Sequence, residues 1–279
     1  MSILEYFKFP FIQYAFIVGI LIALTAALIG VPLVLKRYSY LGDGLSHVAF
    51  TGMSIATVAN MTNNLLIVMP VTIITAVALL LPKRNAKINV DSLIAIVSVG
   101  TLALGYFIIN TFSNSANVSG DVCASLFGST SILTLQPFDV WLSIVISVAV
   151  ILSFVFLYNK IFATTFDADF AIATGVRSRT YELVIAILIA VVVSISMRLV
   201  GSLLTSALII FPALSSMRIF KNFKSVVICS AILGVISTAA GLLAAIIFET
   251  PVGATIVLID ILVFIIFCLL GLSYKKRVG

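Results

Sequence analysis

Apolar residues fill the chain in long runs, separated by short polar or charged stretches. A run of roughly 17–25 such residues is the length that an α-helix needs to cross the hydrocarbon core of a bilayer. Candidate runs are Phe11–Leu35, Leu41–Ala59, Leu65–Leu81, Ser92–Ile109, Phe138–Tyr158, Glu182–Met197, Leu199–Met217, Val226–Phe248 and Val252–Leu272. The pattern predicts an all-α protein, a polytopic transmembrane bundle of about eight or nine spans. Eight stays open if the first run does not span, or because only Arg198 separates the sixth run from the seventh.

The composition agrees with a protein that lies in lipid. Charged residues make up 9% of the chain and hydrophobic residues 62%, whereas a soluble domain carries about 25% charged residues. The net charge of +6 does not indicate a nucleic-acid partner, because basic residues of membrane proteins gather in cytoplasmic loops. No Pro- or Ser-rich linker divides the chain, which predicts a single transmembrane domain over residues 1–279.

The basic residues predict an orientation. With the N-terminus outside and alternating spans, every Lys and Arg except Lys8 and Arg198 falls in an inner loop. The opposite orientation would put nearly all of them outside, against the positive-inside rule. We therefore expect the N-terminus outside and the C-terminus inside, with residues 159–181 as a cytoplasmic loop.

A carboxylate and the chain's single histidine lie four residues apart near the start of the second run, at Asp43 and His47. Residues four apart share a face of a helix, and ionisable groups inside spans are costly and mark transport pathways. Asp and His are suitable ligands for a divalent first-row cation. Ser46 and Thr51 would lie along the same face. The alternative is that Asp43 caps the helix and His47 is a packed polar residue.

Asp260 is a second acidic residue inside a run, near the middle of the last one. It could be a further metal ligand or a proton acceptor. It could equally be neutralised by protonation or hydrogen bonding and serve packing alone.

The predicted inner loop contains two phenylalanines four residues apart, Phe166 and Phe170, which on a helix would form an apolar stripe. Such a stripe suits docking into a partner's groove or lying on the membrane surface. The chain has no Gly-x4-Gly-Lys-Ser/Thr motif, so it lacks the loop that cradles a nucleotide.

Several segments together resemble the permease subunits of ABC importers for zinc, manganese and iron(II). The second run and the loop before it match that family's Ser-x-x-Gly-Asp-x-x-x-His signature after a basic pair. The matching segments are Lys36–His47, Leu126–Gly128, Phe166–Ala171 with Gly175 and Val176, Arg198–Leu204 continuing to Ile210–Ala213, and Thr250–Gly253. Asp260 departs from the pattern, because a small or apolar residue is expected there.

The resemblance implies a bacterial plasma-membrane permease that forms a homodimer and is not itself an enzyme. Asp43 and His47 would bind the transported divalent metal ion. Ser46, Thr51 and Asp260 are further candidates along its path from their positions in the sequence alone. The coupling loop, with Phe166, Asp169, Phe170, Ala171 and Gly175, would contact a separate cytoplasmic ATP-binding subunit. A metal-loaded binding protein would dock outside, near 110–137. No permanently bound cofactor is implied.

Two other functions remain compatible with the residues alone. A permease for metal chelates would share the same partners but would not need an ion-binding Asp–His pair. A secondary transporter driven by an ion gradient would use Asp260 as its proton or cation site and would need no ATPase.

Overall fold

The computed structural model describes residues 9–61, 64–80, 90–112, 135 and 137–278, and within them the regular structure is entirely helical. The prediction of an all-α fold is confirmed. The helices are α2 (Pro10–Leu35), α3 (Tyr40–Val58), α4 (Leu65–Leu80), α5 (Val90–Phe112), α7 (Pro137–Phe166), α8 (Ala168–Ala173), α9 (Ser178–Val200), α10 (Ser202–Ile219), α11 (Phe223–Phe248) and α12 (Val252–Val278).

Each predicted apolar run forms one of the long helices. Seven helices of the described chain are long and apolar enough to cross a membrane, and α3 and α4 are the two long helices outside that set. α4 is apolar but has only 16 residues. α3 has 19 residues and carries the polar residues of the candidate site. The total of eight or nine spans and the orientation stay predictions.

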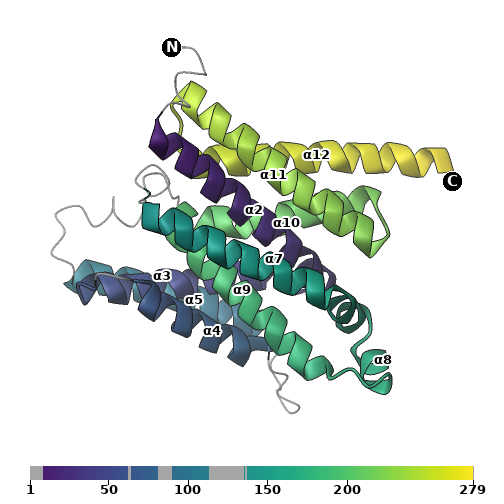
Figure 1. Cartoon of the computed structure of the whole chain (residues 1–279), viewed down its shortest axis with the longest axis horizontal. Helices are drawn as coiled ribbons and strands as arrows, with labels where there is room; N and C mark the ends of the chain where they lie inside the picture. The colour runs from purple at the N-terminus through teal and green to yellow at the C-terminus, as the bar shows by residue number, and fades with distance from the viewer. Residues whose placement is uncertain (1–8, 62–63, 81–89, 113–134, 136, 279) are drawn as a thin grey trace.

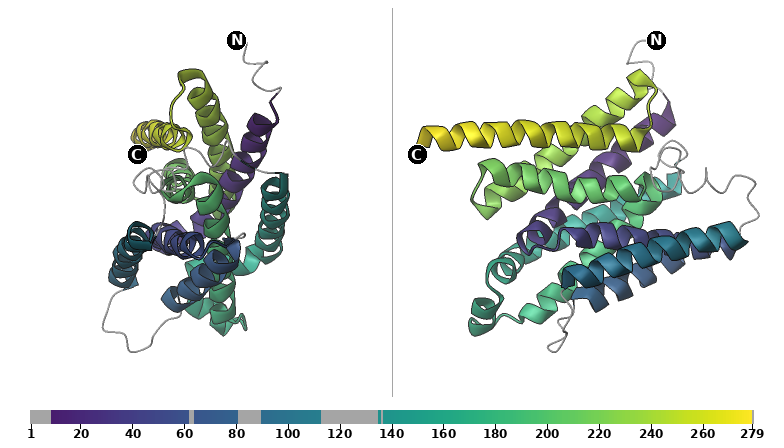
Figure 2. Two further views of the ribbon diagram at one scale, coloured as in Figure 1. Left: turned by 90° about the vertical axis from the view of Figure 1, so that its left-hand side faces the viewer. Right: turned by 180° about the vertical axis from the view of Figure 1, so that it is seen from behind.

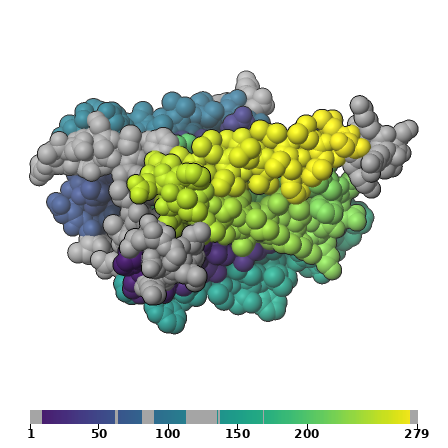
Figure 3. Space-filling model, turned by 90° about the horizontal axis from the view of Figure 1, so that it is seen from above, coloured from purple at the N-terminus to yellow at the C-terminus, as the bar shows by residue number. Residues whose placement is uncertain are grey.

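The helices pack around α2, which contacts α7, α9, α10 and α11. α3, α4 and α5 lie together on one side of the molecule, and α12 lies on the opposite side (Figures 1 and 2). Seen from above, α12 forms an exposed ridge (Figure 3). The outer faces of the bundle are rich in exposed Leu, Ile, Val and Phe, as expected for helices that meet lipid.

The packing of α2 against α10 depends on a glycine. A β-carbon built on Gly30 of α2 would overlap the backbone carbonyl oxygen of Ile209 in α10. Small residues that let helix backbones touch are characteristic of membrane helix pairs. Pro32, two residues further along α2, has no backbone N–H to donate.

We expect Gly30→Ala to lower the melting temperature of the purified protein by several degrees, because α2 and α10 must move apart. Gly100→Ala is the matched control, since its β-carbon would meet nothing within 4 Å and alanine is the better helix former. A thermal scan in detergent measures both. Equal melting of Gly30→Ala and Gly100→Ala would contradict this account of the contact.

The junction between the sixth and seventh runs is a sharp break at Gly201, where φ is 93° and ψ is 163°. Arg198 is therefore not a loop residue but lies in the last turn of α9. There its guanidinium pairs with Asp139 in the first turn of α7 at 2.8 Å. A cation at a helix C-terminus and an anion at a helix N-terminus both suit the helix dipoles.

The predicted loop at 159–181 is more helical than the sequence suggests. α7 continues to Phe166, α8 occupies six residues, and α9 begins at Ser178. Asn159 and Lys160 looked like the start of a loop but lie on the exposed surface of α7. The predicted segment Leu126–Gly128 and most of the predicted outer docking loop at 110–137 lie outside the described residues.

Candidate functional site

A tight turn between α2 and α3 positions the site. Tyr38 donates its N–H to the carbonyl of Leu33, and Arg37 donates to that of Val34. This pair of hydrogen bonds is the Schellman motif that ends many helices. Arg37 occupies the left-handed position, with φ 63°, where glycine is usual. α3 therefore starts at Tyr40, directly after α2 has ended.

Asp43 and His47 face each other on α3, with 3.6 Å between His47 Nε2 and Asp43 Oδ2. Asp43 lies in the first turn of α3, but Ser39 occupies the N-cap position. The alternative interpretation of Asp43 as the helix cap is therefore excluded. The negative charge near the N-terminus is stabilised by the helix dipole.

Two hydroxyls from other helices reach the same carboxylate. Ser98 of α5 donates to Asp43 Oδ2 at 3.4 Å, and Ser206 of α10 donates to Oδ1 at 3.2 Å. α3 packs directly against both helices. Sequence reasoning missed both serines, which lie 55 and 163 residues from Asp43. Serines are frequent in membrane helices, so nothing local marks these two.

The geometry of the pair is compatible with an open, partial metal site. Ligand atoms 3.6 Å apart subtend about 120° at a metal that binds each of them at about 2.1 Å, which suits tetrahedral or trigonal coordination. His47 Nδ1 is buried without a hydrogen-bond partner in the described structure. No third Asp, Glu, His or Cys joins the pair among the described residues. The Asp43 side chain is 37% exposed, so its carboxylate remains accessible.

The structure brings neither Ser46 nor Thr51 to the carboxylate of Asp43. The Ser46 hydroxyl donates to the backbone carbonyl of Asp43 at 2.7 Å. The Thr51 hydroxyl donates to the carbonyls of His47 in its own helix and Thr101 in α5. The two hydroxyls therefore stabilise the backbone of α3, and the Thr51 hydroxyl also links α3 to α5. A role of Ser46 and Thr51 along a metal path stays a prediction.

A charged cluster lies at the same end of the bundle as the turn. Lys36 Nζ and Glu182 Oε1 form an ion pair at 2.8 Å, which ties the end of α2 to the start of α9. Burial raises the pKa of the Tyr38 phenol, and the carboxylates of Glu182 and Asp91 raise it further. The phenol beside the site is therefore neutral at physiological pH.

Asp260 belongs to α12, the helix on the opposite side of the molecule from α3 (Figure 1). It is only 2% exposed. Its Oδ2 atom has no partner in the described structure. The structure does not bring Asp260 to Asp43 and His47.

The predicted coupling residues gather around α8. Asp167 caps this helix by accepting from the N–H of Phe170 at 2.8 Å. Gly175 ends it with φ 83°. Phe170 is exposed and Ala171 is fully buried. The exposed positions among the predicted set are Phe166, Asp169, Phe170 and Gly175.

The predicted stripe of Phe166 and Phe170 does not lie on a single helix, because Asp167 separates α7 from α8. Phe166 is the last residue of α7 and joins an aromatic cluster. Its ring centroid lies 5.0 Å from that of Phe162 and 6.0 Å from that of Phe223 at the start of α11. Both predicted phenylalanines are nonetheless exposed, on adjacent helices.

The bundle of long apolar helices, with a half-exposed Asp–His pair on α3, has the architecture of a multi-pass membrane transport protein. Residues 8–271 match the ABC 3 transport family, and the chain belongs to it. The resemblance seen in the sequence is thereby confirmed, as is the prediction of a multi-pass protein of the bacterial plasma membrane.

Similar proteins include two curated permeases. The manganese import system permease protein ScaB of Streptococcus gordonii is 29% identical over 92% of this chain and 90% of its own length. The high-affinity zinc uptake system membrane protein ZnuB of Haemophilus influenzae is 28% identical over 90% and 94%. Among solved structures, PsaBC from Streptococcus pneumoniae in complex with Fab superposes with a TM-score of 0.83. It has 27% identity over 95% of both chains.

The serines that hold Asp43 provide a graded test of the site. We expect Ser206→Ala to raise the metal concentration for half-maximal uptake about threefold to tenfold, because a hydrogen bond of a polar group contributes about 0.5–1.5 kcal/mol. Ser98→Ala should act in the same direction but less, since its bond is longer.

Ser54→Ala is the control for these variants. Its hydroxyl donates to the carbonyl of Phe50 within α3 and does not reach Asp43. Radiometal uptake as a function of metal concentration separates the three variants. If Ser206→Ala and Ser54→Ala gave the same curve, the hydrogen bond to Asp43 would have no role in uptake.

Proposed function

We propose that the chain is the membrane-spanning permease subunit of an ATP-driven importer. Its cargo is a divalent transition metal ion, either zinc, manganese or iron(II), which it carries into the cytoplasm. The single observation that carries the proposal is the Asp43–His47 pair on α3, held by Ser98 and Ser206. Permeases named for manganese and zinc are similar along most of this chain, which supports the metal class.

The chemistry of the pair suits transport rather than storage. Imidazole nitrogen and carboxylate oxygen both bind first-row divalent cations. Two protein ligands leave the remaining coordination positions to water or to other groups, so the ion can leave again. A pathway must bind its ion strongly enough to admit it and weakly enough to release it.

A second copy of the chain completes the pathway in this proposal. A carboxylate that is 37% exposed cannot face lipid at low cost. It must face water or another protein surface. Two copies that meet on this side would enclose a polar path between their Asp43 carboxylates, which gives the predicted homodimer a structural reason.

The partners follow from the two ends of the bundle. α8 and the C-terminal end of α12 lie at the same end (Figure 1), which the sequence assigns to the cytoplasm. A separate ATP-binding subunit would dock there on α8 and supply the hydrolysis. A metal-loaded binding protein would dock at the other end. ATP binding would switch the pathway between its inward-open and outward-open states.

The direct test is the metal content of cells that lack this chain, measured element by element. One divalent metal should fall in the deletion strain and return when the wild-type chain is expressed. If no metal changes under metal-limited growth, transport of a free ion is excluded and a chelate becomes the candidate cargo.

Asp260 supports one competing function, a secondary carrier that uses an ion gradient. Its buried carboxyl group has one atom without a partner in the described structure. The two functions differ in a simple observation, because an ABC permease copurifies with an ATPase and a secondary carrier does not. Copurification of an ATP-binding subunit with the tagged chain would decide for the importer.

A further inference from the structure

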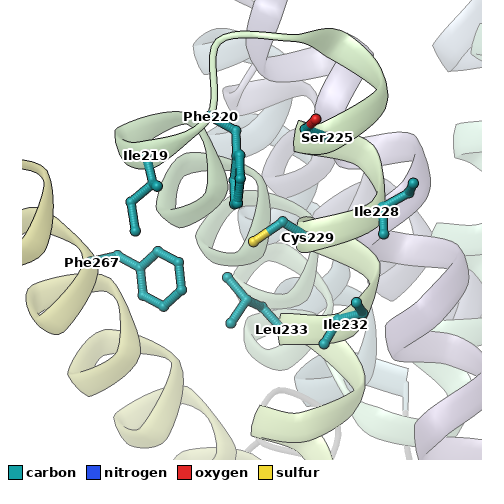
Figure 4. A pocket seen from close by; sticks show the side chains of 8 residues that line it. All are labelled: Ile219, Phe220, Ser225, Ile228, Cys229, Ile232, Leu233 and Phe267. Atoms are coloured by element: carbon teal, nitrogen blue, oxygen red, sulfur yellow. The ribbon is translucent and has the colours of Figure 1, made fainter.

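A groove opens between α11 and α12, near the short turn that connects α10 to α11 (Figure 4). Its volume is about 540 Å³, within the range of ordinary ligand sites. The wall is apolar except at Ser225 and Cys229, and it includes Phe220, Leu233 and Phe267. Cys229 and Leu233 point into the groove from α11, and Phe267 closes it from α12 (Figure 4).

The groove exists because α11 and α12 diverge. Near the start of α12 the two helices touch, since a β-carbon on Gly241 would lie 2.8 Å from Ile256 Cα. Further along, α12 packs against α10 instead, with ring centroids of Phe211 and Phe264 at 6.1 Å. The space between the separating helices is the groove, and α12 runs on away from α11 (Figure 1).

Positive charge lies at the turn from α10 to α11, beside residues that line the groove. Arg218, Lys221 and Lys224 are exposed and flank the lining residues Phe220 and Ser225 in sequence. The Arg218 guanidinium lies over the ring of Phe264 at 5.5 Å. Residues 212–248 and 261–279 contain no Asp or Glu, and the second segment ends with further cations at 275–277.

We propose that this groove binds an anionic phospholipid, with an acyl chain between α11 and α12 and the phosphate beside Lys221 and Lys224. An apolar slot between membrane helices with cations at its cytoplasmic mouth has the chemistry that recognises acidic head groups. A second copy of this chain fits less well, because docking there would bring two sets of uncompensated cations together. The inference goes beyond the proposed function and does not depend on which ion is carried.

The two free cysteines of the described chain can report whether a lipid occupies the groove. Cys229 lines the groove and Cys268 does not, although both are half-buried. The purified full-length protein is treated with N-ethylmaleimide in micelles containing phosphatidylglycerol or phosphatidylcholine with identical acyl chains. Mass spectrometry then gives the alkylation rate of each thiol. We expect phosphatidylglycerol to slow alkylation of Cys229 selectively and to leave Cys268 unchanged.

The variant Lys221→Ala/Lys224→Ala tests the head-group contact. Each cation near an anionic lipid contributes about fivefold in binding, so half-maximal protection should need at least about tenfold more phosphatidylglycerol. Lys160→Ala/Arg179→Ala is the control, because it removes the same charge from exposed positions outside the groove and should cause no shift.

Three outcomes would overturn the proposal. Equal protection of Cys229 by both lipids would mean that the groove does not select an anionic head group. An unchanged response in the Lys221 and Lys224 variant would remove the assigned contact. Protection of Cys229 that rises with protein concentration and without added lipid would show that a second copy covers the groove.

Discussion

Replacing His47 with alanine is expected to abolish uptake of the cargo metal while the complex with its partners still assembles. The imidazole supplies one of the two protein ligands that α3 offers, and Nε2 lies 3.6 Å from Asp43 Oδ2. Its loss leaves one carboxylate, which cannot hold a transition metal ion against water. The side chain is only 14% exposed, so the change also leaves a small cavity, which is why assembly must be measured separately.

Asp43→Asn sharpens this test because it keeps the size of the side chain and one oxygen that can accept from Ser206. Only the charge and the strong ligand oxygen are lost. We expect uptake to fall to the level of the deletion strain, with total cellular content of the metal as the readout. Thr57→Ala on the same helix is the control, since its hydroxyl is exposed and bonds only within α3.

Assembly is measured in the same cells by copurification of the ATP-binding subunit with the tagged permease. Normal copurification together with lost uptake places the defect at the ion site. Wild-type uptake by both Asp43→Asn and His47→Ala would remove the pair from the transport path.

Much of the fold could be predicted because membrane helices are marked by length and apolarity, both of which are local. Every predicted run became a helix of the described chain. The predicted ends of the helices were less accurate where polar residues lie on the exposed face of a helix, as at Asn159 and Lys160 of α7. Arg198 looked like the boundary between two spans, but it lies within α9 and pairs with Asp139 of α7, which is far away in the sequence. The actual break between the two helices is the backbone conformation of Gly201.

The site was predicted only where its residues share one helix. Four-residue spacing places His47 beside Asp43 whatever the rest of the molecule does. Ser98 and Ser206 reach Asp43 through the packing of α5 and α10 against α3, which one sequence cannot reveal. Spacing also suggested Ser46 and Thr51, but hydroxyls in helices often bond a carbonyl of a preceding turn. Both do so here.

α8 is expected to be the element that couples ATP hydrolysis to transport, and Phe170→Ala should uncouple the two. Phe170 is 65% exposed on α8, the short helix that follows the end of α7, so its ring is available to contact a partner. We expect ATPase activity of the reconstituted complex to lose its stimulation by the metal-loaded binding protein, and uptake to stop. Phe248→Ala is the control, because Phe248 is also well exposed, at 72%, but is the last residue of α11 and not part of α8.

Substitutions of Gly175 test the backbone conformation at the end of α8 separately from the exposed side chains of that helix. The φ of +83° at Gly175 is a conformation that glycine adopts freely, and a β-carbon there would meet nothing within 4 Å of this chain. The N–H of Val176 donates to the carbonyl of Ala171, so this conformation closes the C-terminal end of α8. A β-branched residue in the left-handed region costs about 1–2 kcal/mol, whereas asparagine is tolerated there.

Gly175→Val should therefore uncouple ATPase activity from uptake, and Gly175→Asn should keep most of the coupling. Both side chains would enter the same open space, so better coupling with asparagine is the result that the backbone conformation predicts. If the two variants were equally defective, the space beside Gly175 would be filled by the partner subunit rather than free. If both variants and Phe170→Ala were fully coupled, α8 would not be the docking element, and the ATP-binding subunit would contact another part of the cytoplasmic end.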